Sequence, residues 1–337
     1  MPRRTNNLEI VTLFVSALLV AWPAHGAPAE LDDAADHHVG LQGRYANGLA
    51  DSWEWKLGSG RSAENLTGIS AIGLVAAHRI TKQKAHLDSA QRAARALLGA
   101  FDRGFRQRRP FTQDIEFLVA AGYIIDAYRW FGRIVGRHSA ASFAEQVLAR
   151  RAASGAGSLA GWDLASAIRA AVAVGRTDYA RGLLSHAVEH RLRWDRADRG
   201  RAQLLARASL LWSLARLRDV VGLSSSEAQL AGELQRALIK AQRPNGAWLT
   251  DDGQHFSTQL TAYATIGLSA WSKRLSKAAE GGRRWLERVG SEDQKLIAGG
   301  RIWSAHYNLK ERPEGDFYGA VQSEVLLALS SNSSSSH

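Results

Sequence analysis

Two kinds of segment with helical periodicity alternate strictly along the chain. Six are almost wholly apolar and span residues 65–78, 113–128, 161–174, 203–217, 257–271 and 317–330. Five have one charged, arginine-rich face and span residues 84–101, 139–153, 177–192, 225–242 and 274–289. A helix that is apolar on every side must be surrounded by protein, whereas a helix with one charged face lies at the surface. No segment shows the two-residue alternation that is typical of a half-buried strand.

This alternation predicts an all-α fold, an α/α toroid in which about six helical hairpins form a ring with the apolar helices inside and the amphipathic helices outside. Only five amphipathic segments follow apolar ones, so we expect residues 38–56 to supply the sixth outer helix. A single toroid domain is therefore expected over residues 30–331. The serine-rich residues 332–337 are expected to form a disordered tail.

Residues 1–29 have the pattern of an export signal. Two arginines precede an apolar run from Ile10 to Trp22, and small residues follow, with cleavage expected after Gly26 or Ala29. The run is too short for a comfortable membrane span, so no stable span is expected once the signal is removed. The mature protein is expected in the periplasm or outside the cell.

The segment that follows the signal is polar, and we expect it to be a flexible arm. It contains acidic and histidine residues of the types that bind metals: Asp32, Asp33, Asp36, His37 and His38. A flexible arm holds ligands poorly, and no spacing such as His-Glu-x-x-His supports a metal elsewhere. We therefore expect no metal site and no other cofactor.

Composition and charge narrow the classes of partner. With 45% hydrophobic and 22% charged residues, the chain of 337 residues is typical of a globular protein. The formal net charge of +11 favours attraction to an anionic polymer, although codon bias in a GC-rich genome also raises the arginine content. The expected partner is an acidic glycan or a cell-envelope polymer rather than a nucleic acid. The absence of cysteine excludes disulfides, thiolate zinc sites and a cysteine nucleophile.

One short segment, residues 236–248, ends an amphipathic helix and leads towards the next apolar one. It reads as arginine, alanine and leucine followed by Gln242, Gly246 and Trp248. This pattern resembles the QW motif of the terpenoid cyclase and protein prenyltransferase superfamily, seen most clearly in squalene–hopene-type cyclases. The resemblance implies an α/α toroid in which the glutamine and the tryptophan brace one outer helix against the next.

The activities of that superfamily do not carry over with the motif. Its triterpene cyclases use an Asp-x-Asp-Asp motif, and the nearest stretch here, residues 113–116, contains only Asp114 and Glu116 as acids. Its prenyltransferases use a zinc site with a cysteine ligand, which this chain lacks. The same helical ring is also used by many secreted enzymes that cleave glycans, and that likeness concerns the fold alone.

We expect the pocket at the N-terminal ends of the inner helices. In such a ring all inner helices run parallel, so these ends gather on one side. The connections that lead into them are the longer ones, at residues 102–112, 193–202, 243–256 and 290–316, and long loops carry function more often than short ones. The positive ends of the helix dipoles there favour an anionic ligand group.

Polar and aromatic residues concentrate at those ends. The candidates for catalysis are Asp114, Glu116, Asp163, Asp251, His255, His306 and Tyr318. The candidates for substrate binding are Trp162, Gln259, Trp303, Tyr307 and Gln322. Each has a structural alternative, because acids before a helix also cap it and loop histidines often only make hydrogen bonds. Capping does not explain Glu116 or Gln322, which lie a turn or more inside apolar helices.

Three functions remain open at this stage. The first is an exported enzyme that acts on an acidic polysaccharide as a lyase or a hydrolase. The second is a toroid without catalysis that binds a glycan or a protein of the cell envelope. The third is a cyclase-like protein that acts on a hydrophobic ligand. An open cleft with exposed tryptophan and facing carboxylates favours the first, a filled ring the second, and a deep aromatic cavity the third.

Overall fold

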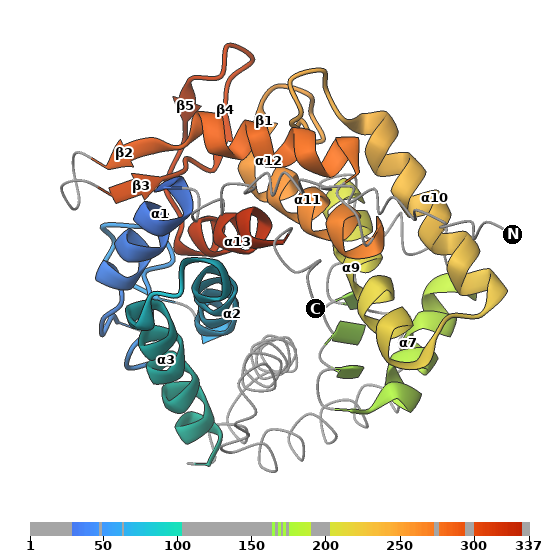
Figure 1. The fold of residues 1–337 in the computed structure, drawn as a ribbon, viewed down its shortest axis with the longest axis horizontal. Coiled ribbons are helices and arrows are strands. Elements are labelled where there is room, and N and C mark those ends of the chain that lie inside the picture. The colour runs from blue at the N-terminus through green and yellow to red at the C-terminus, as the bar shows by residue number, and fades with distance from the viewer. Residues whose placement is uncertain are drawn as a thin grey trace, which may run out of the picture.

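Helices form two concentric layers around a ring in the computed structural model (Figure 1). It describes residues 29–46, 49–62, 64–102, 164–165, 168–169, 171–172, 175–189, 203–272, 276–293 and 300–331. The inner layer contains α2 (Glu64–Thr81), α9 (Gln203–Val221), α11 (Thr258–Ser272) and α13 (Gly319–Ser330). The outer layer contains α1 (Ala29–Gly40), α3 (Lys84–Asp102), α7 (Thr177–Glu189), α10 (Ser225–Ala241) and α12 (Lys277–Val289). The predicted α/α toroid is therefore confirmed.

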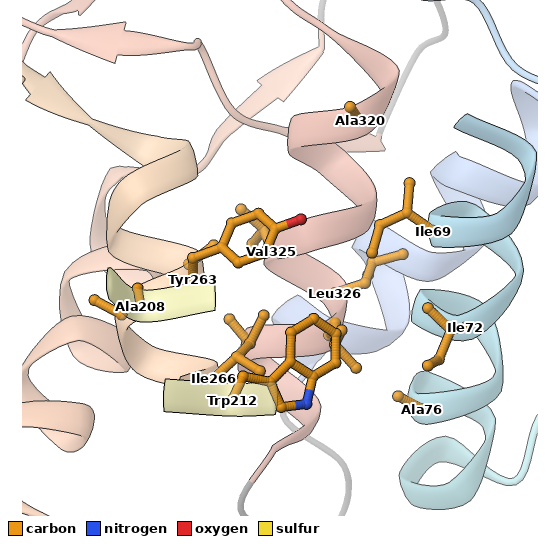
Figure 2. Close-up of a cluster of buried hydrophobic side chains, with 14 of the residues drawn as sticks. Ile69, Ile72, Ala76, Ala208, Trp212, Tyr263, Ile266, Ala320, Val325 and Leu326 are labelled. Carbon is orange, nitrogen blue, oxygen red and sulfur yellow. The ribbon is translucent and has the colours of Figure 1, made fainter. Parts of the chain in front are cut away.

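The inner helices pack against their neighbours in the ring, α2 on α13, α13 on α11 and α11 on α9. Every residue of α13 is buried, and α11 is buried from Leu260 to Ser269. Figure 2 shows apolar side chains from α2, α9, α11 and α13 meeting inside the ring, with Trp212 of α9 beside Ile266 of α11. A Cβ atom on Gly267 would lie 2.6 Å from a backbone oxygen of α9, so only glycine allows these two helices to approach so closely.

Two of the outer helices, α10 and α12, begin at side-chain caps. Ser224 caps α10 in a capping box, in which its hydroxyl accepts from the backbone N–H of Glu227 and the Glu227 carboxylate accepts from the backbone N–H of Ser224. Buried leucines at 230, 234 and 238 form one stripe of α10, at the four-residue spacing of a helix face. Ser276 caps α12 in the same position. Among the described residues, no helix is long and apolar enough to cross a membrane.

Residues 242–248 follow α10 in the chain, and their side chains connect the end of α10 to the start of α12 through hydrogen bonds. The side-chain amide of Gln242 donates to the carbonyl of Gly246 (2.8 Å) and to the carbonyl of Ala278 in α12 (2.7 Å). The indole N–H of Trp248 donates to the carbonyl of Leu238 in α10 (2.9 Å), and its side chain is fully buried. These contacts hold two outer helices together, which is the bracing role expected for this segment.

Two expectations for the N-terminal region are wrong. The polar segment after the expected signal is the helix α1, not a flexible arm, and it packs on α2, α3 and α13. Its buried residues are Leu31, Ala34, Ala35, His37 and His38. Most of them are alanine or histidine, so hydropathy alone does not mark this face. Residues 38–56 do not form the sixth outer helix, because α1 takes that place and the chain beyond it runs in turns and isolated bridges.

Short strands also occur where none was expected. β1 (Phe256–Ser257), β4 (His306–Tyr307) and β5 (Pro313–Glu314) form an antiparallel sheet in the order β1-β4-β5. β2 (Ser291–Asp293) pairs with β3 (Gly300–Ile302). With two or three residues each, these strands are too short to show an alternating sequence pattern. The predicted helices at 113–128 and 139–153 and the tail at 332–337 lie outside the described residues. So does the expected signal at 1–29, except for Ala29, which begins α1.

Replacing Trp248 with alanine is expected to lower the free energy of unfolding by about 3–5 kcal/mol, because a fully buried aromatic side chain is lost from a packed junction. Urea denaturation followed by circular dichroism measures the change. The matched control is Trp55→Ala, since the Trp55 side chain is 43% exposed and its removal leaves no large cavity. An unchanged unfolding midpoint for Trp248→Ala would show that this segment does not brace the ring.

Candidate functional site

The three-stranded sheet lies beside the N-terminal ends of α11 and α13. β1 leads directly into α11, and the chain passes from β5 through residues 315–318 into α13. Tyr318 is the N-cap residue of α13, although its side chain makes no capping hydrogen bond. The loops that enter the inner helices therefore carry the site candidates Asp251, His255, His306 and Tyr318, at the end of the ring where we expected them.

A histidine pair and a glutamate form the centre of this cluster. The Nε2 atom of His255 lies 3.0 Å from a carboxylate oxygen of Glu314, and the rings of His255 and His306 are 6.0 Å apart between centroids. Partial burial, and then the neighbouring His255, lower the pKa of His306 below its usual value. At pH 7 His306 is therefore neutral and able to accept a proton.

Two adjacent aspartates next to the histidines have opposite environments. Partial burial, and then the charge of Asp252, raise the pKa of Asp251. The Asp252 carboxylate accepts hydrogen bonds from the Thr250 hydroxyl (2.6 Å) and the backbone N–H of Gln254 (3.0 Å), and the first of these contributes most to lowering its pKa. Neighbouring acids whose pKa values move apart are an arrangement found where one group donates a proton and another stays charged.

An aromatic and charged group lies next to Tyr318. Trp55 contacts the Tyr318 ring edge-on with 6.0 Å between centroids, and it remains partly exposed. Beside it, the ammonium group of Lys56 lies 2.8 Å from the carboxylate of Asp316 and, by that hydrogen bond, lowers the pKa of Asp316. Exposed tryptophan next to a lysine is suited to contact a sugar ring and an anionic group.

An open hollow of about 540 Å³ lies between the turn at 254–255 and the β4–β5 hairpin. Its polar lining is Gln254, His255, Asn308, Lys310, Arg312 and Glu314, with Leu309 as the apolar member. Two cations, two amides and the His255–Glu314 pair thus face the same space. This lining is suited to a polar or anionic ligand.

Three of the predicted substrate-binding residues support the fold instead. The indole N–H of Trp303 donates to the carbonyl of Leu286 in α12 (2.8 Å), and its backbone N–H donates to the side chain of Gln322 (2.8 Å). The Tyr307 hydroxyl donates to the carbonyl of Val289 (2.9 Å), and burial raises its pKa to about 12. All three side chains are buried and hydrogen-bonded within the protein, so Trp303, Tyr307 and Gln322 each have a structural role.

Gln259 connects the site to a buried acid that was not among the candidates. Its side-chain amide donates to the carboxyl of Glu324 (3.0 Å), which is almost fully buried between α11 and α13. Burial raises the pKa of Glu324 to about 8, so this carboxyl is protonated at neutral pH. An acid in the middle of an apolar helix was the sequence signal for this residue.

The remaining candidates cannot be placed against this cluster. Asp114, Glu116, Trp162 and Asp163 lie outside the described residues. Within the residues that are described, the site candidates form no group of three metal ligands. The arrangement that the structure does place is a set of proton-transfer groups next to cationic and aromatic side chains.

Comparisons with solved structures find the same fold in proteins of low sequence identity. The chain is similar to a variant of an unsaturated glucuronyl hydrolase from Streptococcus agalactiae, with a TM-score of 0.62, 14% identity and 90% of each chain covered. An unsaturated glucuronyl hydrolase from Bacillus sp. GL1, described as responsible for the degradation of glycosaminoglycan, gives a TM-score of 0.61 at 15% identity, covering 89% of this chain and 94% of the other. Cellobiose 2-epimerase from Bacillus thermoamylovorans gives 0.62 at 11% identity, covering 90% and 98%.

The similarity is one of structure and not of sequence. The sequence matches no protein-family profile, and it matches no curated protein. Identities of 11–15% show a shared fold alone. The three similar proteins named above act on sugars, and the resemblance to terpenoid cyclases drawn from residues 236–248 gains no support from them.

Glu324→Gln is expected to stabilise the protein at neutral pH. Below the ordinary glutamate pKa of 4.5 the carboxyl is protonated in both the folded and the unfolded state, so it adds no pH dependence. Between 4.5 and about 8 the unfolded chain ionises while the folded chain keeps its proton, so the free energy of unfolding falls as the pH rises. Glutamine removes this loss, which is about 3 kcal/mol at most near pH 7.

Thermal melts of wild type and Glu324→Gln across this pH range provide the measurement. The melting temperatures are expected to diverge above pH 4.5 and to agree below it. Glu314→Gln is the matched control, because that carboxylate is exposed. Equal stability of wild type and Glu324→Gln at every pH would mean that Glu324 is ionised in the folded protein.

Proposed function

We propose that this chain is an exported enzyme that processes acidic oligosaccharides, acting as a hydrolase or a lyase. The observation that carries the proposal is the cluster of His255, His306, Glu314 and Asp252 at the N-terminal end of the inner helices. Proton-transfer groups lie here on loops, where the fold does not require them. The similarity in fold to unsaturated glucuronyl hydrolases supports a uronic acid as the acidic sugar.

Electrostatics favour an anionic substrate at this end of the ring. Lys310 and Arg312 line the hollow next to His255, and Lys56 lies beside the exposed Trp55. The net charge of +11 and the helix N-termini add a positive potential of longer range. A uronate carboxylate is thereby attracted, while Trp55 offers a flat apolar face for its ring.

Two chemical roles are needed for either reaction. In a hydrolase, one carboxylic acid protonates the leaving oxygen and a second group activates water, with carboxyl groups about 5 Å or about 6.5–9.5 Å apart. In a lyase, a base such as a neutral histidine removes a proton next to the uronate carboxylate. We assign the acid roles to Asp114, Glu116, Asp163 and Asp251, and the base roles to His255, His306 and Tyr318. Gln259 and Trp162 are assigned to substrate binding.

The test of this function is an incubation of the purified full chain with three sugars: an unsaturated uronyl disaccharide, its saturated counterpart and neutral cellobiose. Mass spectrometry of the products follows the reaction, together with the ultraviolet absorbance of the C4=C5 double bond, which hydrolysis of the unsaturated sugar removes and lyase cleavage of the saturated sugar creates. We expect consumption of at least one uronyl sugar. Asp163→Asn and His255→Ala are each expected to lower kcat by about 10²-fold or more, because each removes a proton-transfer group.

Asp88→Asn is the matched control for this series. Asp88 pairs with Lys84 on the outer helix α3, away from the N-terminal loops, and its substitution is expected to leave kcat unchanged. If uronyl sugars bind to the wild type without being consumed, the protein is a binding toroid and not an enzyme. If no sugar binds, the glycan proposal falls as a whole.

Export is proposed from the sequence of residues 1–29 and has a separate test. Because α1 begins at Ala29 and packs against the ring, cleavage after Gly26 leaves this helix intact, and we expect it in preference to cleavage after Ala29. N-terminal sequencing of protein from the periplasm or the medium gives the cleavage position. Full-length protein confined to the cytoplasm would contradict this prediction.

A further inference from the structure

Asp32, Asp36 and His86 come together where α1 packs on α3. One potential ligand atom from each of the three residues lies within 4.8 Å of the others. Asp32 and Asp36 are four residues apart, so they share a face of α1. His86 lies in the first turn of α3, and its side chain is completely buried. This cluster is on an outer pair of helices and is separate from the candidate site at the N-terminal ends of the inner helices.

The hydrogen bonds of the cluster leave one acidic oxygen without a partner. Nε2 of His86 lies 2.8 Å from Asp36, and Nδ1 of His86 lies 2.9 Å from the Thr81 hydroxyl. One carboxylate oxygen of Asp32 is buried and has no hydrogen-bond partner in the described part of the chain. A buried, unpaired carboxylate oxygen costs free energy, and a bound cation removes that cost.

We propose that Asp32, Asp36 and His86 bind a divalent transition-metal ion, with Zn²⁺ as the best-suited member of this class. Two carboxylates and one imidazole match the oxygen and nitrogen ligands of such ions. Calcium is less suited, because it takes six to eight oxygen ligands. Thr81 completes the arrangement, because its hydroxyl lies 2.9 Å from Nδ1 of His86 and can accept from Nδ1–H in the tautomer whose Nε2 binds the metal.

The ion would join the first helix of the ring to the third. Without metal, the Nε2–H of His86 donates to Asp36. With metal, this proton leaves Nε2, Nδ1 takes one up and donates it to the Thr81 hydroxyl, and Nε2 binds the ion. The sequence alone hid this site, because the two aspartates were assigned to a flexible arm and His86 was not considered with them.

Isothermal titration of chelator-treated, tag-free full chain with ZnCl₂ tests the proposal. One saturable site is expected, together with a rise in melting temperature when ZnCl₂ is present. Asp32→Asn and Asp36→Asn are each expected to weaken Zn²⁺ binding at least about tenfold, because each removes a ligand charge while keeping the side-chain size.

Asp33→Asn is the matched control, because Asp33 lies on α1 next to Asp32 but is exposed and is not a member of the cluster. It is expected to bind Zn²⁺ like the wild type. His86→Gln replaces a buried side chain and can lower stability by itself. Its effect on Zn²⁺ binding is therefore interpreted only together with those of the aspartate variants. Absence of saturable binding at millimolar Zn²⁺, equal affinity of wild type and Asp32→Asn, or a preference for CaCl₂ over ZnCl₂ would each overturn the proposal.

Discussion

The inner helices have no face that tolerates water, and the rest of the structure depends on this constraint. Every residue of α13 is buried, and the neighbouring α2 and α11 cover its sides. Because apolar surface gains about 25 cal/mol per Å² on burial, a lone hairpin with such a helix would leave much of that gain unrealised. A ring gives each inner helix two inner neighbours and an outer cover. The amphipathic character of the outer helices follows, since they face the inner layer on one side and solvent on the other.

The same constraint distinguishes two kinds of polar side chain. Some are buried between the inner helices and stabilise the fold through hydrogen bonds, whereas others are exposed and are not needed for packing. Inside the ring, several polar side chains are paired: the hydroxyls of Ser70 and Ser323 lie 2.7 Å apart, and Arg169 donates to the hydroxyl of Ser209 (2.6 Å). Gln322 is satisfied in the same way by the backbone of Trp303. His255 and His306 in the candidate site, by contrast, are partly exposed to water and could be replaced without leaving a buried group unpaired. Their presence there argues for a role in binding or chemistry.

The sequence predicted the layers of this fold better than its loops. The apolar segment at 257–271 corresponds to α11 at Thr258–Ser272, because helical periodicity over four turns is a strong signal. α1 escaped prediction because alanine and histidine form its buried face. The role of Trp303 could not be read from sequence, because it depends on which way the 290–316 connection folds. That connection packs Trp303 onto α12 and presents His306 at the surface, although the two residues are three positions apart.

The N-terminal helix α1 and the candidate site are linked through one short segment of backbone, residues 53–55. The indole N–H of Trp53 donates to the carbonyl of His38 at the end of α1 (2.7 Å), and the two rings stack at 4.9 Å. Two residues later, the carbonyl of Trp55 accepts from the backbone N–H of Gly319 at the start of α13 (3.0 Å). His38 also contacts Ser323 of α13 through Nε2 (3.0 Å), and burial keeps it neutral by lowering its pKa to about 3. The exposed face of Trp55 in the candidate site is therefore positioned by α1. The contacts that hold α1 on the ring also set the geometry of the site.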